Sequence, residues 1–99
     1  MVNLHSLLKA VVEKGASDLH LTVGSPPQLR IDGELVQLNL PPLQPAEVKQ
    51  LCYSVLTESQ KHRFEEENEL DFAFTIRGLA RFRGNVFKQK GSVAAAFRF

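Results

Sequence analysis

Apolar and polar residues alternate with two different periods along the chain, and these periods predict helices and strands. Between Asn3 and Gly15, leucines and valines recur every three to four residues, which indicates an amphipathic helix over residues 4–14. Residues 18–23 alternate singly between apolar and polar, the pattern of a half-buried strand. The pair Asp32-Gly33 lies between two further alternating segments, residues 28–31 and 34–38, and predicts a β-hairpin.

The second half of the chain predicts two more helices followed by a meander. Pro45 suits the first turn of a helix, and Thr57 to Gln60 reads as a capping box that opens another helix reaching residues 65–67. The buried face of the first of these helices should be Val48, Leu51, Cys52, Val55 and Leu56. Turns at 77–78 and 90–91 separate strands over 70–76, 80–88 and 92–99. We therefore expect an α+β fold, with about three helices and about six antiparallel strands in one sheet.

Length and composition restrict the class of protein. Ninety-nine residues allow one domain, which we expect to span residues 1–99. The hydrophobic fraction of 43% and the charged fraction of 23% are typical of a folded soluble protein, and no apolar run approaches the roughly 20 residues of a membrane helix. The one cysteine, Cys52, excludes an internal disulfide. The chain ends within an alternating strand, so we expect a piece of a longer protein.

Charge is distributed unevenly. Residues 1–71 hold six lysines and arginines against eleven acids, a net charge of −5, whereas residues 72–99 hold six basic residues and no acid, a net charge of +6. This asymmetry suggests that the last third of the chain meets an anionic partner.

Catalytic motifs are scarce. No two glycines have the spacing of a phosphate-binding loop, so this chain should not hydrolyse a nucleotide by itself. Ser17, Asp18 and His20 are the residue types of a hydrolase triad, but alternation along one strand puts Asp18 and His20 on one face and Ser17 on the other. His5, His20 and His62 fall on three different elements and show no metal-binding spacing.

The arginines of the last two strands are the strongest candidates for binding. Alternation points Arg81, Arg83 and Asn85 away from the core, while Phe82 and Val86 point into it. On the last strand, Arg98 points outward and the residues expected inward are Val93, Ala95, Phe97 and Phe99.

The turn between these strands determines which residues face each other. A two-residue turn at Lys90-Gly91 pairs Gln89 with Ser92 and therefore sets Arg83 opposite Arg98. Like charges opposed across strands reduce stability, and an anion between them relieves this cost. Guanidinium groups suit phosphate oxygens. The alternatives are a merely solvated basic face and arginines paired with the acidic first part of the chain.

Nucleic acid is a less suitable partner. The aromatic residues between the arginines are expected on the inward side, where they offer no stacking platform for bases. The net charge of +1 is also low for nucleic-acid binding.

Taken together, these residues resemble the N-terminal domain of PilT-type motor ATPases, the enzymes of type IV pilus retraction and twitching motility within the secretion ATPases. The resemblance is colinear over nearly all 99 residues. It is carried by residues 15–22 (GASDLHLT), 26–33 with PP and RIDG, 38–43 with its double proline, 53–54, 60–64, 69–72 (ELDF) and 81–87 (RFRGNVF).

The resemblance implies a PAS-like fold joined, in the parent protein, to a RecA-like domain that carries the Walker motifs. It implies a cytoplasmic hexamer at the inner-membrane base of the pilus, with ATP and Mg²⁺ used by the full-length enzyme and no cofactor bound to this part alone. It further implies that Arg81, Arg83 and Arg98 reach the phosphates of ATP held between the two domains. The partners would be the RecA-like domains of the same and the neighbouring subunit and the machinery of the pilus base, with no nucleic acid and no membrane insertion.

Two functions of other classes remain open at this point. One is a free-standing PAS-like module that holds a small ligand in its core, although the inward residues Leu21, Phe72, Phe82 and Phe97 are apolar. The other is a nucleic-acid-binding module that uses the basic strands.

Overall fold

The computed structural model describes residues 2–99, and within this range it has three helices and six strands. The α+β class predicted from the sequence is confirmed. The helices are α1 (Leu4–Glu13), α2 (Pro45–Tyr53) and α3 (Glu58–Glu67). The strands are β1 (Asp18–Leu21), β2 (Gln28–Ile31), β3 (Glu34–Gln37), β4 (Glu69–Ile76), β5 (Ala80–Gln89) and β6 (Ser92–Arg98).

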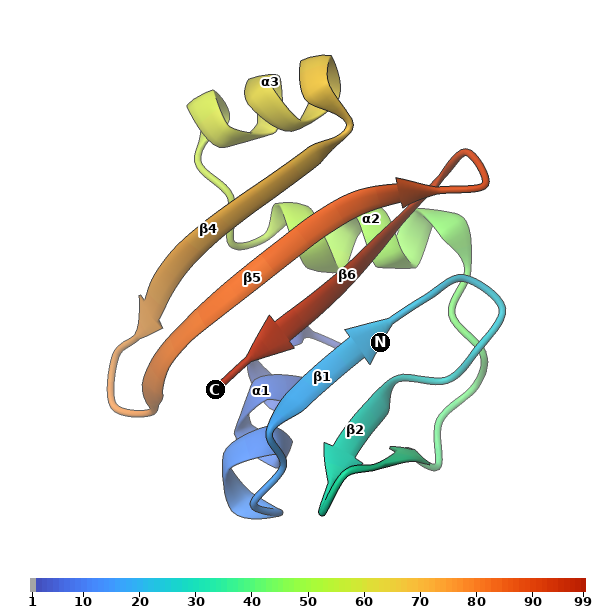
Figure 1. The fold of residues 1–99 in the computed structure, drawn as a ribbon, viewed down its shortest axis with the longest axis vertical. Helices are drawn as coiled ribbons and strands as arrows, with labels where there is room; N and C mark the ends of the chain where they lie inside the picture. The colour runs from blue at the N-terminus through green and yellow to red at the C-terminus, as the bar shows by residue number, and fades with distance from the viewer. Residues whose placement is uncertain (1) are drawn as a thin grey trace.

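The six strands form one antiparallel sheet in the order β3-β2-β1-β6-β5-β4 (Figure 1). Each half of the sheet is a meander of three strands that follow one another in the sequence. The two meanders join through β1 and β6, where Leu19 lies opposite Phe97. The first and the last strand of the chain are thus neighbours in the middle of the sheet.

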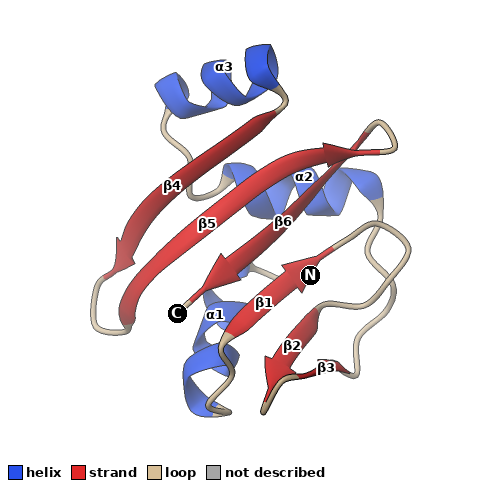
Figure 2. Cartoon of the chain, in the orientation of Figure 1, coloured by secondary structure: helices blue, strands red, loops and turns tan. Residues whose placement is uncertain are grey.

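The helices leave one face of this sheet uncovered. α1 and α2 lie behind the sheet in the view of Figure 2, while α3 lies beside the start of β4. The core fills the space between the sheet and the helices, and we call this side of the sheet its inner face. Its largest fully buried side chains include Leu8 and Val11 of α1, Val48 of α2, Phe64 of α3, and Leu19, Phe82, Val86 and Phe97 of the strands.

Side chains at the helix ends explain where the helices begin. The Asn3 side chain accepts a hydrogen bond from the Ser6 amide at 2.8 Å, as the sequence predicts for a cap of α1. Thr57 and Gln60 form the reciprocal bonds of the predicted capping box at α3. Asn68 caps the end of α3, and its φ of 63° lies in the left-handed region that asparagine tolerates.

Two expectations about burial need correction. α2 ends at Tyr53, so Val55 and Leu56 follow the helix; Leu56 is buried there and Val55 is partly buried. The Ser54 hydroxyl donates to the Leu51 carbonyl at 2.6 Å, a local bond of the kind that competes with helix continuation. Phe99, expected to point inward, is 56% exposed because it lies past the end of β6, at the rim of the core.

Candidate anion-binding site

The uncovered face of the sheet, which we call the outer face, receives alternate side chains from every strand. On β5, Arg81 and Arg83 are exposed on this face, whereas Phe82 between them is only 1% exposed on the inner face. Arg98 of β6 is exposed as well. The structure thus places all three predicted arginines on one face.

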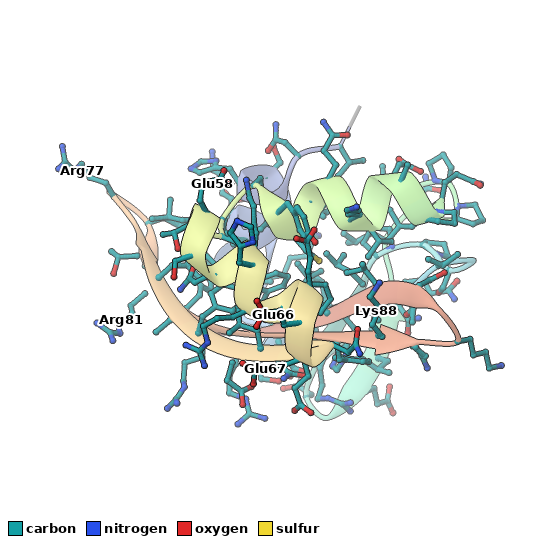
Figure 3. All side chains as sticks on the ribbon, turned by 90° about the horizontal axis from the view of Figure 1, so that it is seen from above. Glu58, Glu66, Glu67, Arg77, Arg81 and Lys88 are labelled. Atoms are coloured by element: carbon teal, nitrogen blue, oxygen red, sulfur yellow. The ribbon has the colours of Figure 1, made fainter. Side chains whose placement is uncertain are left out.

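The register between β5 and β6 is the one predicted from the Lys90-Gly91 turn. Gln89 lies opposite Ser92, and Arg83 lies directly opposite Arg98. Arg81 is two residues from Arg83 on the same face and pairs with Thr75 of β4. Figure 3, in which the helices lie on one side of the sheet, shows Arg81 toward the end of the β4–β5 hairpin.

These three arginines have no acidic partner within the described part of the chain. Between residues 2 and 99, no carboxylate oxygen lies within 4.0 Å of a side-chain nitrogen of Arg81, Arg83 or Arg98. Asp71, an acid on the same face, instead accepts a hydrogen bond from the Asn85 amide at 2.8 Å. The alternative in which the acidic first part of the chain neutralises these arginines is therefore wrong for this structure.

A second group of polar residues lies on the other side of β6 and centres on Asp18. The Ser17 hydroxyl donates to Oδ1 of Asp18, and the His20 ring, through Nε2, donates to Oδ2. The Nε of Arg30 on β2 lies 3.5 Å from the same Oδ2. We call Ser17, Asp18, His20 and Arg30 the Asp18 cluster.

The Asp18 cluster corrects the expected position of Ser17 and excludes a hydrolase triad. The sequence placed Ser17 on the opposite face, but Ser17 precedes β1, so strand alternation does not apply to it. A hydrolase triad needs a histidine between the serine and the acid, because the histidine must take the proton of the hydroxyl. Here the acid lies in the middle, and His20 has no bond to Ser17 within residues 2–99.

The environment of Asp18 favours its charged form. Partial burial alone would raise the pKa of the Asp18 carboxyl, but hydrogen bonds from Ser17 and His20 and the charges of His20 and Arg30 lower that pKa below its ordinary value of 3.8. Asp18 is therefore a carboxylate at neutral pH.

A shallow, open hollow of about 240 Å³ lies between the arginines and the Asp18 cluster. Ala96 of β6 has a small side chain, and the longer side chains of its neighbours in register, His20 and Asn85, rise on either side of it. A ligand on such an open surface would stay half in solvent unless a second body covered it. The charged and polar residues at this hollow are Asp18, His20, Asp71, Arg83, Asn85 and Arg98.

The sequence indicated Arg83, Arg98, Asp18 and His20, but not that these four residues share this hollow, whereas Arg81 does not line it. Arg98 and Asp18 are more than 70 positions apart in the sequence and become neighbours only through the pairing of β1 with β6. No local signal in the sequence specifies that pairing.

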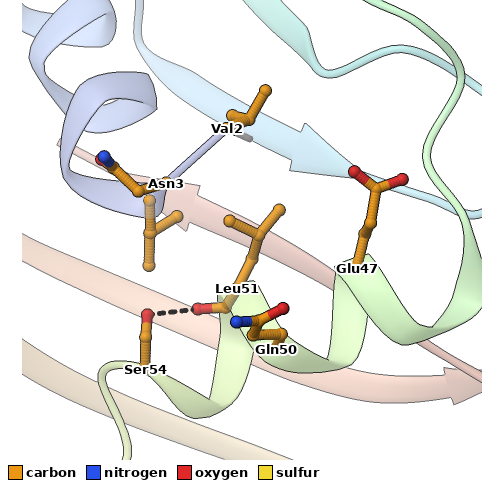
Figure 4. A pocket seen from close by; sticks show the side chains of 7 residues that line it. Val2, Asn3, Glu47, Gln50, Leu51 and Ser54 are labelled. Carbon is orange, nitrogen blue, oxygen red and sulfur yellow. Dashed lines mark hydrogen bonds between the residues drawn. The ribbon is translucent and has the colours of Figure 1, made fainter.

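A smaller hollow of about 160 Å³ lies between the start of α1 and α2 (Figure 4). Its one acid, Glu47, accepts a hydrogen bond from the Gln44 amide and thereby caps α2. This hollow offers no group of titratable side chains for chemistry.

Between residues 2 and 99 no three histidine, cysteine or acidic side chains are arranged to hold a metal ion. In the same range, no helix is both long enough and apolar enough to cross a bilayer.

Sequence and fold were compared with those of known proteins. No protein-family model matches the chain. It is 43% identical, over 98% of its length, to the type IV pilus retraction ATPase PilT of Pseudomonas aeruginosa, and 35% identical, again over 98%, to the type IV pilus ATPase PilU of that organism. A crystal structure of the pilus retraction motor PilT with bound ADP superposes on the whole chain with a TM-score of 0.93 and 46% identity.

The sequence identity and the fold therefore define an N-terminal domain of a type IV pilus ATPase. Sequence and structure together identify the chain with the N-terminal region of PilT-type pilus retraction ATPases. The chain spans 28% of the length of PilT from Pseudomonas aeruginosa and 25% of the length of PilU. It is more similar to PilT than to PilU.

Proposed function

We propose that this chain is the N-terminal regulatory and oligomerisation domain of a hexameric pilus retraction ATPase, and that Arg81, Arg83 and Arg98 contact the phosphates of ATP. The observation that carries the proposal is the outer face itself. Three exposed guanidinium groups, without an acidic partner in the described structure, lie on one sheet face of a chain 43% identical to PilT. The similar PilT structure contains ADP.

The geometry supports a role for these arginines that needs a second domain. The hollow is open, so a nucleotide bound there would be covered on its other side by a RecA-like domain, of the same or of the neighbouring subunit. The opposed pair Arg83 and Arg98 would then be stabilised by the anion between them, because the phosphate charge offsets their mutual repulsion.

ATP turnover would then move the domain. Arginines directed at the terminal phosphate sense its presence and stabilise the charge that develops during transfer. When that phosphate leaves, the contact weakens and the cleft between the domains opens. The hexameric ring would pass this motion to the machinery at the base of the pilus, on the cytoplasmic side of the inner membrane. Mg²⁺ would be held by the phosphates of ATP and by the RecA-like domain.

The test is ATP turnover by the full-length parent protein with Arg81→Ala, Arg83→Ala and Arg98→Ala introduced singly. We expect each variant to lose turnover on the order of 100-fold, the effect of removing one donor that stabilises transition-state charge. The matched control is Arg63→Ala, because Arg63 is an exposed arginine that lies on α3, outside the sheet, and pairs with Glu67. Unchanged turnover in all three outer-face variants would refute the arginine contacts.

The packing of the core argues against a free-standing ligand-binding module. Leu21, Phe72, Phe82 and Phe97 are buried in one hydrophobic cluster. Phe72 and Phe97 form an edge-to-face pair with ring centroids 6.3 Å apart. A small ligand would have to displace these side chains.

A further inference from the structure

Asp18 lies between two arginines in the sheet but binds only one of them. In the register of the strands, Asp18 is directly opposite Arg30 of β2 on one side and Arg98 of β6 on the other. Its carboxylate lies 3.5 Å from the Nε of Arg30. Within residues 2–99, however, no carboxylate lies within 4.0 Å of Arg98.

The bonds made by Asp18 explain this asymmetry. Oδ1 accepts from the Ser17 hydroxyl, and Oδ2 accepts from His20 and faces Arg30. Both oxygens are thus engaged by donors from β1, β2 and the residue before β1, and the side chain is only 12% exposed. A carboxylate that accepts hydrogen bonds on both oxygens has little tendency to rotate toward another partner.

The position of this carboxylate affects the proposed phosphate site. A carboxylate free to rotate beside Arg98 would form an ion pair with it and compete with any phosphate for the same guanidinium. When no anion is bound, the charge of the Asp18 carboxylate still reduces the repulsion between Arg98 and Arg83, although the carboxylate makes no ion pair with Arg98.

We infer that Ser17, His20 and Arg30 are positioning residues that hold the Asp18 carboxylate away from Arg98 and so keep Arg98 available to the nucleotide phosphate. This inference rests on the proposed function, because it assumes that Arg98 contacts that phosphate. It assigns a role to residues 17–20, the Ser-Asp-x-His segment that leads into β1 and forms no catalytic triad.

The test measures the Kd of a non-hydrolysable ATP analogue with the full-length parent protein. His20→Ala removes a donor from the carboxylate and should weaken binding about twofold to fivefold, the effect of one competing, partly exposed ion pair. Asp18→Asn should change Kd by less than about twofold, because the carboxylate of the unmodified protein is already held away from Arg98. A merely structural role for Asp18 predicts clearly weaker binding instead, since losing the cluster would loosen the site.

The double variant gives the decisive result. In the Asp18→Asn background, His20→Ala should have no effect on Kd, because no carboxylate remains to be held. His62→Ala is the matched control, since His62 is exposed on α3. If an unfolding experiment shows that His20→Ala is not folded, Ser17→Ala is the alternative. Ser17 is exposed and donates to the other carboxylate oxygen, Oδ1, so its loss should also weaken binding.

The outcomes separate this inference from the proposed function. If Arg98→Ala leaves Kd unchanged, Arg98 does not contact the nucleotide and both proposals fail. If Arg98→Ala weakens binding but Asp18→Asn also weakens it, only the positioning role fails. The positioning role fails as well if the effect of His20→Ala is the same in the Asp18→Asn background as in the unmodified protein.

Discussion

The two faces of the sheet differ most clearly along β5. On the inner face, Phe82, Gly84 and Val86 are buried, and their neighbours determine the space that each can fill. On the outer face, Arg81 and Arg83 extend into solvent without an acidic partner in the described structure. The same strand therefore contributes packed side chains to the core and charged side chains to the opposite surface. Substitutions on the inner face should change stability, and those on the outer face should change binding.

The largest expected effect is on the inner face, at Phe82. Its ring is stacked on Phe74 with centroids 5.7 Å apart, and it is 1% exposed. Phe82→Ala should lower the free energy of unfolding by about 3–5 kcal/mol, through lost burial and the cavity that remains. Urea unfolding measures this difference. Arg83→Ala, one position away on the outer face, should change the same quantity by at most about 0.5 kcal/mol. Equal losses in both variants would contradict the division into two faces.

The next effect concerns the glycine of the same strand. A Cβ placed on Gly84 would lie 2.6 Å from Cζ of Phe72, a ring packed against Phe74 and Phe97. Gly84→Ala should therefore lower the free energy of unfolding by about 1–3 kcal/mol, the cost of overpacking a filled core. Ala73→Ser on the outer face of β4 is the control and should be nearly neutral. A stabilised Gly84→Ala variant would show that the ring moves aside easily.

A third prediction concerns pH and the Asp18 cluster. The pKa of Asp18 is lowered in the folded chain, so the unfolded chain takes up a proton first as the pH falls. The resulting stabilisation is present above the ordinary value of 3.8 and is lost as the pH falls through the folded value. Asp18→Asn should be less stable at neutral pH by about 1–2 kcal/mol, because hydrogen bonds to a charged acceptor weaken.

Unfolding midpoints in urea between about pH 6 and pH 3 measure this dependence. The stability of the Asp18→Asn variant should fall less steeply with decreasing pH than that of the unmodified chain. Asp32→Asn, in the turn between β2 and β3, controls for the loss of one carboxylate. If stability falls equally steeply with decreasing pH in all three proteins, the Asp18 cluster contributes nothing to the pH dependence.

The smallest expected effect is a gain in stability. Arg98 lies directly opposite Arg83, and like charges in this arrangement are destabilising. Arg98→Gln should therefore raise the free energy of unfolding by about 0.2–1 kcal/mol in the absence of nucleotide. The gain should shrink as salt is added, because salt screens the repulsion. A loss of stability that salt does not change would indicate that the Arg98 stem contributes packing instead.

Much of the fold could be predicted from the sequence, because the signals were local. The capping residues Asn3 and Thr57 begin their helices as expected, and the Lys90-Gly91 turn places Arg83 opposite Arg98. Errors occurred where a local pattern was extended past the end of its element. Ser17 precedes β1, Val55 follows α2, and Phe99 follows β6.

The sequence by itself thus determined the elements, the two faces of each strand and the opposition of two arginines, because turns and alternation act between residues close in the chain. The tertiary structure alone decided that β1 pairs with β6, which brings Asp18 beside Arg98 and sets one acid between two arginines. This pairing joins strands that are far apart in the sequence and depends on how the two meanders pack against the helices. No short stretch of sequence specifies a contact between residues so far apart.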